Sequence, residues 1–295
     1  DMNINTLIFL AKDYKGYVYY KSKYAKSKCS WDVLEYIIKK CREYNIKIYP
    51  YINVFSEQGY FLKENPQYEE LRKNNKRTNW ASPSLKPVRE RILNIIKEII
   101  ENYDIDGIQL DRIRYPGYND DGFHPESIKQ YKKIYKKEPD IKDPDFYNFK
   151  CDLITSFVKE SYDFVKSYNK NLNFSAAVFH TPTTAKNNRI AQQWDLWVKN
   201  NYLDYVFTMS YTSDINTFKK YLKENTQLFN MFKPKTKLVV GIGVYYEGMN
   251  ADILKQQINL CFEEENVSGI CFFNAYNLFN NNEFMTLLKN IEIQK

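Results

Sequence analysis

The feature that most constrains the fold of this chain is a regular alternation of short apolar segments with longer amphipathic ones. Strand patterns are predicted at 5–11, 46–54, 108–111, 172–179, 205–211, 238–245 and 268–276. Helical patterns separate them, at 30–44, 87–102, 149–167, 192–199, 215–231 and 252–264, and a last one closes the chain at 281–291. Strands that are each followed by a helix, with no hairpin signal between them, indicate a parallel α/β sheet.

The number of strand patterns favours a barrel with one unit fewer than usual. A TIM (β/α)8 barrel needs eight strands, and this sequence supplies seven. Residues 1–5 resemble the end of a turn into a strand, so we expect the first strand and helix of the barrel to be missing from this chain. A doubly wound sheet is the rival, but no glycine-rich phosphate loop follows the first strand. The prediction is one barrel domain over 1–295, with long loops at 56–84 and 117–148 and a short helix near 67–73 within the first loop.

Composition sets the broad class of protein. Hydrophobic residues make up 43% and aromatic residues 17% of 295, which is typical of a folded globular chain. The net charge of +7 is spread in short runs, which indicates a solvated surface and argues against nucleic-acid binding, while binding to an anionic polymer such as a cell wall stays compatible with it.

Five scattered cysteines predict free thiols, without a zinc site. No segment is long enough to span a membrane and no signal peptide is visible, so a lipid anchor could only lie outside this chain.

The segment 104–117 (DIDGIQLDRIRYPG) carries the strongest functional signal. Ile108 and Leu110 alternate with Gln109 and Asp111, so the two polar residues share one face of a buried strand. A polar group there is costly unless a site needs it. Because α/β barrels keep their chemistry at the carboxyl ends of strands, we predict that Asp111 is catalytic or touches the substrate, with an ion pair to Arg114 or Lys12 as the alternative.

Further polar and aromatic residues are predicted at the same mouth of the barrel. Glu247 is the expected partner carboxylate, with Asp13 or Asp214 in its place as alternatives. The expected substrate-binding residues follow strand ends or line the long loops: Lys12, Asn53, Trp80, Arg114, Tyr115, His180, Tyr211 and Asn274. Two carboxylates about 5 to 10 Å apart suffice to cleave a glycosidic bond, and aromatic rings support sugar rings. His and Cys are too few and wrongly spaced for a metal site, GxSxG is absent, and no cofactor is predicted.

Several of these segments resemble the glycoside-hydrolase-like family 10 proteins. The specific part is Val88 to Pro116, with NWASP at 79–83 before it. Weaker similarity continues through SAAVF at 175–179, QWDLW at 193–197, LDYVFTMSYT at 203–212 and GIG at 241–243. The resemblance implies a TIM barrel, hydrolysis of an amino-sugar polymer such as the glycan of peptidoglycan, and a central role for Asp111. It also implies substrate contacts by Arg114, Tyr115 and Tyr211.

A second resemblance, to the family 18 chitinases, fails at the chemistry. Those enzymes use an Asp-x-Asp-x-Glu run whose Glu is the proton donor, and Gln109 and Ile113 occupy two of its positions here. The sequence therefore predicts a secreted or envelope-associated glycosidase of another kind, acting on a polysaccharide. The alternative is a barrel that binds carbohydrate without cleaving it. The polymer, its linkage and the stereochemical outcome are not encoded in any motif.

Overall fold

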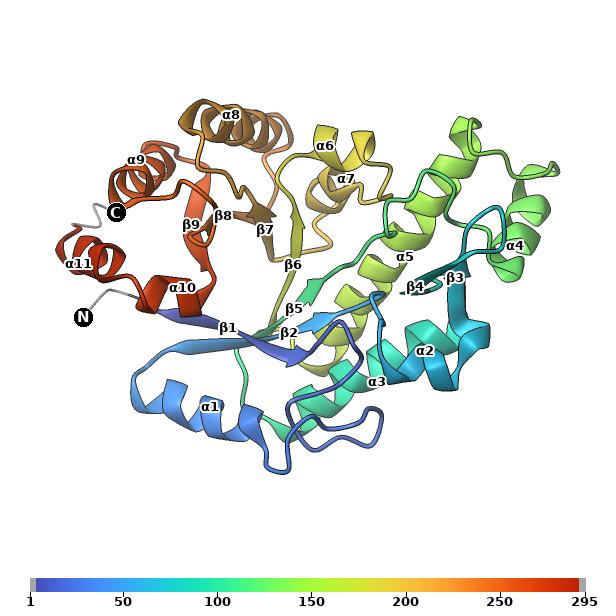
Figure 1. Ribbon diagram of the computed structural model, residues 1–295, viewed down its shortest axis with the longest axis horizontal. Coiled ribbons are helices and arrows are strands. Elements are labelled where there is room, and N and C mark those ends of the chain that lie inside the picture. The colour runs from blue at the N-terminus through green and yellow to red at the C-terminus, as the bar shows by residue number, and fades with distance from the viewer. Residues whose placement is uncertain (1–3, 292–295) are drawn as a thin grey trace.

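A computed structural model of the protein describes residues 4–291, and its centre is a curved sheet of seven parallel strands (Figure 1). The strands follow the chain in the order β1-β2-β5-β6-β7-β8-β9. Their bounds are β1 (Thr6–Lys12), β2 (Lys47–Asn53), β5 (Gly107–Asp111), β6 (Asn173–Phe179), β7 (Tyr205–Met209), β8 (Lys237–Gly243) and β9 (Val267–Phe273). The sheet is an open half-barrel with β1 and β9 at its edges, which confirms the predicted α/β barrel type.

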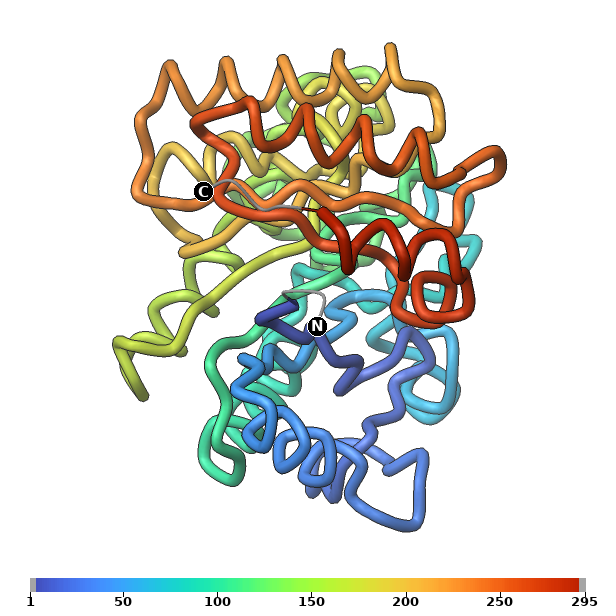
Figure 2. The backbone as a smooth tube through the Cα atoms, turned by 90° about the vertical axis from the view of Figure 1, so that its left-hand side faces the viewer, coloured from blue at the N-terminus to red at the C-terminus, as the bar shows by residue number. Residues whose placement is uncertain are grey.

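Helices cover the outside of the sheet, as the sequence alternation predicts (Figures 1 and 2). The longer ones are α1 (Val33–Glu43), α3 (Lys86–Asn102), α4 (Pro125–Tyr135), α5 (Pro144–Tyr168), α8 (Ile215–Phe232), α9 (Ala251–Phe262) and α11 (Asn282–Asn290). The shorter ones are α2 (Tyr60–Glu64), η1 (Pro66–Tyr68), α6 (Pro182–Asn187), α7 (Trp194–Lys199) and α10 (Ala275–Phe279). In α3, proline lies in the first turn and isoleucines at 92, 95, 96 and 99 are all buried, so the helix packs one apolar stripe on the sheet.

The strands have an outer face under the helices and an inner, concave face. In β5, Ile108 and Leu110 are fully buried and belong to the main core, so Gln109 and Asp111 point to the concave side. The pairing register places Asn53 of β2 beside Asp111. This alternation brings the polar strand ends together at one edge of the sheet.

The loop after β2 differs from the predicted secondary structure. The loop 56–84 was expected to hold a short helix near 67–73, but it contains an antiparallel pair, β3 (Glu69–Leu71) and β4 (Arg77–Ala81). Glu70 of this pair is buried, and its carboxylate accepts hydrogen bonds from Ser82 Oγ (2.6 Å) and from the backbone N–H groups of Leu71 and His124. A buried acid therefore fastens the hairpin to the loop 117–124, a contact between distant segments that no local pattern reveals.

Burial raises the pKa of Glu70 to about 7, which predicts a pH-dependent stability. A folded-state pKa above the unfolded value of about 4.3 adds stability that is complete below the unfolded pKa and is lost as the pH rises to about 7. The shift corresponds to a loss on the order of 3 kcal/mol. We expect Glu70→Gln, which keeps the hydrogen-bonding shape, to remove this dependence. Urea unfolding of both proteins from pH 4.5 to 8 measures it, and parallel stability curves would contradict the prediction.

Two remaining expectations concern the membrane and the cysteines. Among residues 4–291, no helix combines the length and the apolar character needed to cross a bilayer. No disulfide joins the cysteines of the described chain; Cys41 and Cys151 are buried, and Cys29 and Cys271 are half-buried. The predicted thiol state is thus confirmed for these four residues. The strand and helix expected before residue 5 lie outside the described residues.

Candidate active site at the carboxyl ends of the strands

Asp111 lies at the carboxyl end of β5 and is half-buried on the concave side of the sheet. Its Oδ1 accepts a hydrogen bond of 2.6 Å from the backbone N–H of Arg112. Arg112 has a φ of +51°, a left-handed conformation that turns the chain away from the strand directly after the acid. The local backbone therefore fixes one carboxylate oxygen and leaves Asp111 at the rim.

Two tyrosines flank Asp111 from neighbouring parts of the rim. Burial raises the pKa of Tyr51 in β2, and the negative charge of Asp111 raises it further. The pKa of Tyr211, which follows β7, is raised in the same way, by burial first and by Asp111 among the nearby groups. Both phenols therefore stay protonated at neutral pH and can donate hydrogen bonds beside the carboxylate.

Arg114 lies between aromatic rings close to Asp111. Its guanidinium carbon is 5.0 Å from the ring centre of Phe179 and 5.8 Å from that of Trp80. Its Nη1 is buried without a hydrogen-bond partner among the described residues. Burial lowers the pKa of Arg114, the negative charge of Asp111 opposes that shift, and the positive charge of Arg112 adds to it. Trp80, predicted as a lid or sugar platform, is 7% exposed, and in this structure its ring supports Arg114 and presents little surface to a sugar.

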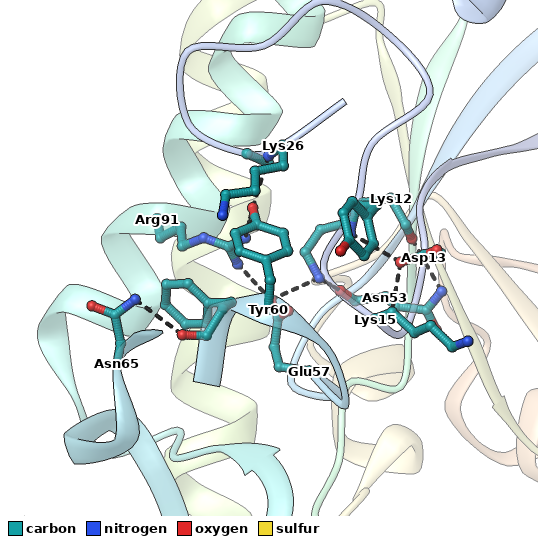
Figure 3. A network of polar contacts seen from close by, with 12 residues as sticks. Lys12, Asp13, Lys15, Lys26, Asn53, Glu57, Tyr60, Asn65 and Arg91 are labelled. Carbon is teal, nitrogen blue, oxygen red and sulfur yellow. Dashed lines mark hydrogen bonds and ion pairs between the residues drawn. The ribbon is translucent and has the colours of Figure 1, made fainter. Parts of the chain in front are cut away.

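A buried ion network lies behind the rim (Figure 3). Lys12 Nζ contacts Glu57 Oε1 at 2.8 Å and donates to the backbone oxygen of Asn53 at 2.7 Å. Arg91 Nη1 reaches the same Glu57 oxygen at 2.5 Å, and Asn53 Nδ2 donates to the backbone oxygen of Lys12 at 3.1 Å. Lys12 and Asn53 are almost fully buried, and their hydrogen bonds hold the ends of β1 and β2 together. Contrary to the prediction, they have almost no surface to offer a substrate. Glu57, which the sequence prediction missed, is the anion at the centre.

Tyr115 is a second correction. The backbone N–H of Tyr115 donates to the carbonyl of Ile190, and the side chain enters the core with no exposed surface. The ammonium group of Lys150, itself paired with the buried Asp121 at 2.6 Å, lies 5.1 Å from the ring centre of Tyr115. The turn after Arg114 thus directs this ring inward, and it offers nothing to a ligand.

An aromatic platform forms the other side of the rim. The ring of Tyr211 stacks on Phe273 at the end of β9, with centroids 5.5 Å apart and planes 11° apart, and Tyr245 packs edge-on against both. Gly243 permits this arrangement, because a Cβ there would lie 2.9 Å from Cβ of Tyr211. Phe273 is 41% exposed and Tyr245 44% exposed, so the platform presents rings to solvent. Neither was predicted; the only signal was their place at or just past a strand end.

The remaining predicted residues divide into cap residues and rim residues. Asp214 and Asn274 are helix caps: Asp214 accepts from the N–H of Thr217 at 2.6 Å, and Asn274 accepts from that of Asn277 at 3.1 Å. His180 stacks on Tyr221 at 3.9 Å between centroids, and burial lowers its pKa, which keeps the imidazole neutral at pH 7. Glu247 is exposed in the loop after β8, and its backbone oxygen accepts from Ser213 Oγ at 2.7 Å.

Asp13 is the acid that shares a neighbour with Asp111. It is buried at the end of β1, and its Oδ1 accepts from the backbone N–H groups of Lys15 (2.9 Å) and Tyr17 (3.0 Å). Burial is the main cause of the raised pKa of Tyr51, and the charges of both Asp111 and Asp13 add to it, so both acids lie near this phenol. Within residues 4–291, His, Cys, Asp and Glu form no cluster suited to a metal ion.

Known proteins share this architecture. The structure is similar to the glycoside hydrolase domain of PgaB (BpsB) from Bordetella bronchiseptica, with a TM-score of 0.76 at 13% identity over 98% of this chain and 89% of that one. A chitinase from Chromobacterium violaceum ATCC 12472 matches with a TM-score of 0.55 at 10% identity, covering 96% and 89% of the two chains. A β-galactosidase from Rahnella sp. R3 matches with a TM-score of 0.64 at 11% identity, over 88% of this chain and 47% of that one. At these identities the likeness shows the fold alone.

Two sequence comparisons complete the picture. An S-layer-related protein from Niallia circulans matches at 28% identity, and the match covers 38% of this chain and only 9% of that much longer protein. The profile of the family described as "Glycosyl hydrolase-like 10" matches residues 1–258. That match covers most of the sequence and includes Asp111, the tyrosines beside it and Glu247. The chain therefore belongs to the glycosyl hydrolase-like 10 family.

Proposed function

We propose that this protein is a glycoside hydrolase that acts on a cell-envelope polysaccharide or another polysaccharide containing amino sugars. The observation that carries the proposal is the position of Asp111: a half-buried carboxylate at a strand end on the concave face, between two phenols that stay protonated. This is the edge at which α/β barrels do their chemistry. Membership of a glycosyl hydrolase-like family supports the same reading.

The proposed mechanism uses two carboxylates. Asp111 serves as nucleophile or as the base that activates water, and a second acid protonates the oxygen of the leaving sugar. Glu247 takes this second role in our proposal, because it is exposed on the loop after β8 and no hydrogen bond found among the described residues uses its carboxylate. Asp13 is the alternative, because its charge reaches Tyr51 together with that of Asp111.

Sugar rings would be held by the aromatic platform of Tyr211, Phe273 and Tyr245. Rings of this kind bury the apolar face of a sugar while hydroxyl groups hydrogen-bond at the edge. His180 follows β6 and Asn274 follows β9, and both would bind hydroxyl groups. Arg114, fixed beneath the rim by Trp80 and Phe179, would stabilise the charge of Asp111.

A non-catalytic carbohydrate-binding barrel is the second candidate. The state of the two candidate partner acids favours it. Glu247 lies on an exposed loop, and Asp13 is buried with its Oδ1 already accepting two backbone hydrogen bonds. A protein of that kind would keep the aromatic platform and bind glycans without releasing products. The envelope location proposed for either function is supported by the S-layer-related relative.

The deciding experiment is incubation of the protein with purified envelope glycans, followed by mass spectrometry of the soluble products. New oligosaccharides with free reducing ends support the glycosidase. Glycan that is retained by the protein but recovered at its original length supports the binding barrel and refutes catalysis.

The partner carboxylate is tested by separate variants. We expect Glu247→Gln to lower turnover about a hundredfold, because general acid catalysis typically contributes this much or more. Glu265→Gln, an exposed acid just before β9, is the matched control and should keep full activity. Unchanged turnover in Glu247→Gln together with a large fall in Asp13→Asn would transfer the role to Asp13.

A further inference from the structure

The carboxyl ends of β1, β2 and β5 carry more positive than negative charge. Glu57 is already shared by two cations, Lys12 and Arg91, inside the buried network. At or just past the ends of β1 and β5, the chain carries three further cations, Lys15, Arg112 and Arg114, and two acids, Asp13 and Asp111. This excess of positive charge would add nothing to the binding of a neutral substrate, and it would repel a cationic one.

Two of these cations lie near one exposed ring, that of Tyr14, and one of them, Arg112, directly follows Asp111 in the chain. Lys15 Nζ is 5.8 Å and the guanidinium carbon of Arg112 is 5.5 Å from the ring centre of Tyr14. Tyr14 is 39% exposed, and its backbone oxygen accepts from the N–H of Gln58 at 2.8 Å, so its position is fixed by the loop after β2. No ion pair found among residues 4–291 uses Lys15 or Arg112, and Figure 3 shows the ammonium group of Lys15 turned away from the buried network.

The positive surface continues along the loop 13–32. This segment exposes four more lysines at 21, 23, 26 and 28, of which Lys26 pairs with Glu64. The loop is tied to the body of the protein, because the N–H of Lys23 donates to Glu98 at 2.7 Å and that of Lys26 donates to Tyr60 Oη at 2.8 Å. The lysine charges therefore lie on a loop whose position is fixed by these hydrogen bonds.

We propose that Tyr14, Lys15 and Arg112 form a subsite for a sugar unit that carries a negatively charged group, so that the polysaccharide bound at this rim is anionic. The inference deepens the proposed function by naming the charge class of its substrate, and it rests on that function. Guanidinium and ammonium groups bind carboxylate or phosphate oxygens by charge-assisted hydrogen bonds, while the phenol contacts the sugar ring and its hydroxyl groups. The lysines of the loop would then meet further charged units along the same polymer.

Binding is the direct test, and it is made with the full chain carrying Asp111→Asn so that the polymer stays intact. The probes are a uronate-containing polysaccharide with its carboxyl-reduced form, and a phosphate-containing glycopolymer with its dephosphorylated form. Titration calorimetry at low salt should give an affinity about tenfold or more higher for at least one charged polymer than for its neutral form. A difference in affinity within the uronate pair alone identifies the charged group as carboxylate, and one within the phosphate pair alone identifies it as phosphate. A difference within both pairs means that the subsite accepts either group. Equal affinity within both pairs would overturn the proposal.

Variants locate the effect. Arg112→Gln and Lys15→Gln should each lower affinity for the charged polymer roughly three- to tenfold and leave the neutral form unchanged, whereas Arg112→Lys keeps the charge and most of the affinity. Lys255→Gln, which removes an exposed charge from α9, is the matched control and should bind normally. An equal loss of affinity in the Arg112, Lys15 and Lys255 glutamine variants would mean general attraction to polyanions and refute the subsite. Binding of polyglutamate or single-stranded DNA as tightly as the charged polysaccharide would refute it in the same way.

Hydrolysis is measured separately with the wild-type protein. Charge-dependent binding at Arg112 without any product refutes the glycosidase and leaves the anionic subsite standing. Cleavage of neutral glycans with no preference for charged ones refutes the subsite and leaves the glycosidase standing.

Discussion

Replacing Asp111 by Asn lowers turnover of the glycan roughly a thousandfold or more while the protein stays folded. The amide cannot act as nucleophile or base, and it removes the negative charge that faces the developing positive charge of the sugar. The fold is spared because the asparagine oxygen can still accept the 2.6 Å hydrogen bond from the N–H of Arg112. Initial rates of reducing-end release give kcat and KM, and we expect the loss in kcat.

The matched control for this variant is Asp163→Asn. Asp163 is an exposed acid on the helix α5, where it forms a surface pair with Lys159, so the charge change is the same and the activity should be unchanged. Equal rates in Asp111→Asn and the wild type would remove Asp111 from the mechanism. A rate loss accompanied by lower thermal stability would indicate a structural role instead.

The alternation of strands and helices was readable from the sequence because each element buries one face. The apolar spacing in α3 and the alternation in β5 are set by that burial, and both elements have the predicted type and place. The position of Asp111 at the rim follows from the same alternation. Local periodicity is therefore enough to predict the strands of the sheet and the position of Asp111, which interrupts the apolar pattern of β5.

The corrections share another cause, which is contact between segments far apart in the chain. The β3–β4 pair depends on Glu70 meeting the loop 117–124, and nothing within 69–81 shows that partner. Lys12 was expected to face a substrate because it ends a strand, yet Glu57 from another loop draws it inside. Tyr115 follows the strongest motif in the sequence, and the turn after Arg114 still directs it into the core.

The aromatic platform was missed for a related reason. Tyr211 was predicted as a strand-end residue, but its value to a site depends on Phe273, which lies on another strand at the same rim. The strand β9 was expected to continue to Tyr276, whereas it ends at Phe273 and Asn274 caps α10. Single residues at strand ends can be found from sequence, but which of them stack on one another depends on the curvature of the sheet.

Truncating Glu57 to alanine is expected to cost the fold about 3 to 5 kcal/mol of unfolding free energy. The change leaves Lys12 fully buried and Arg91 largely buried, with no anion between them, and it removes the charge that opposes the effect of burial on Lys12. Burial already lowers the pKa of Lys12, so without Glu57 its amine should be neutral in the folded protein. Urea unfolding at pH 7 measures the loss, and Glu64→Ala, which breaks the exposed pair with Lys26, should cost less than about 1 kcal/mol.

The pH dependence of that loss distinguishes a missing charge from a mere cavity. A lysine whose folded-state pKa is lowered adds stability above its unfolded pKa near 10.4, and that stability is lost as the pH falls. The deficit of Glu57→Ala should therefore shrink as the pH rises from 7 toward 10, because the unfolded chain then gains less by protonating Lys12. A cavity alone gives a deficit that does not change with pH, and that result would mean that Glu57 fills space without holding the two cations.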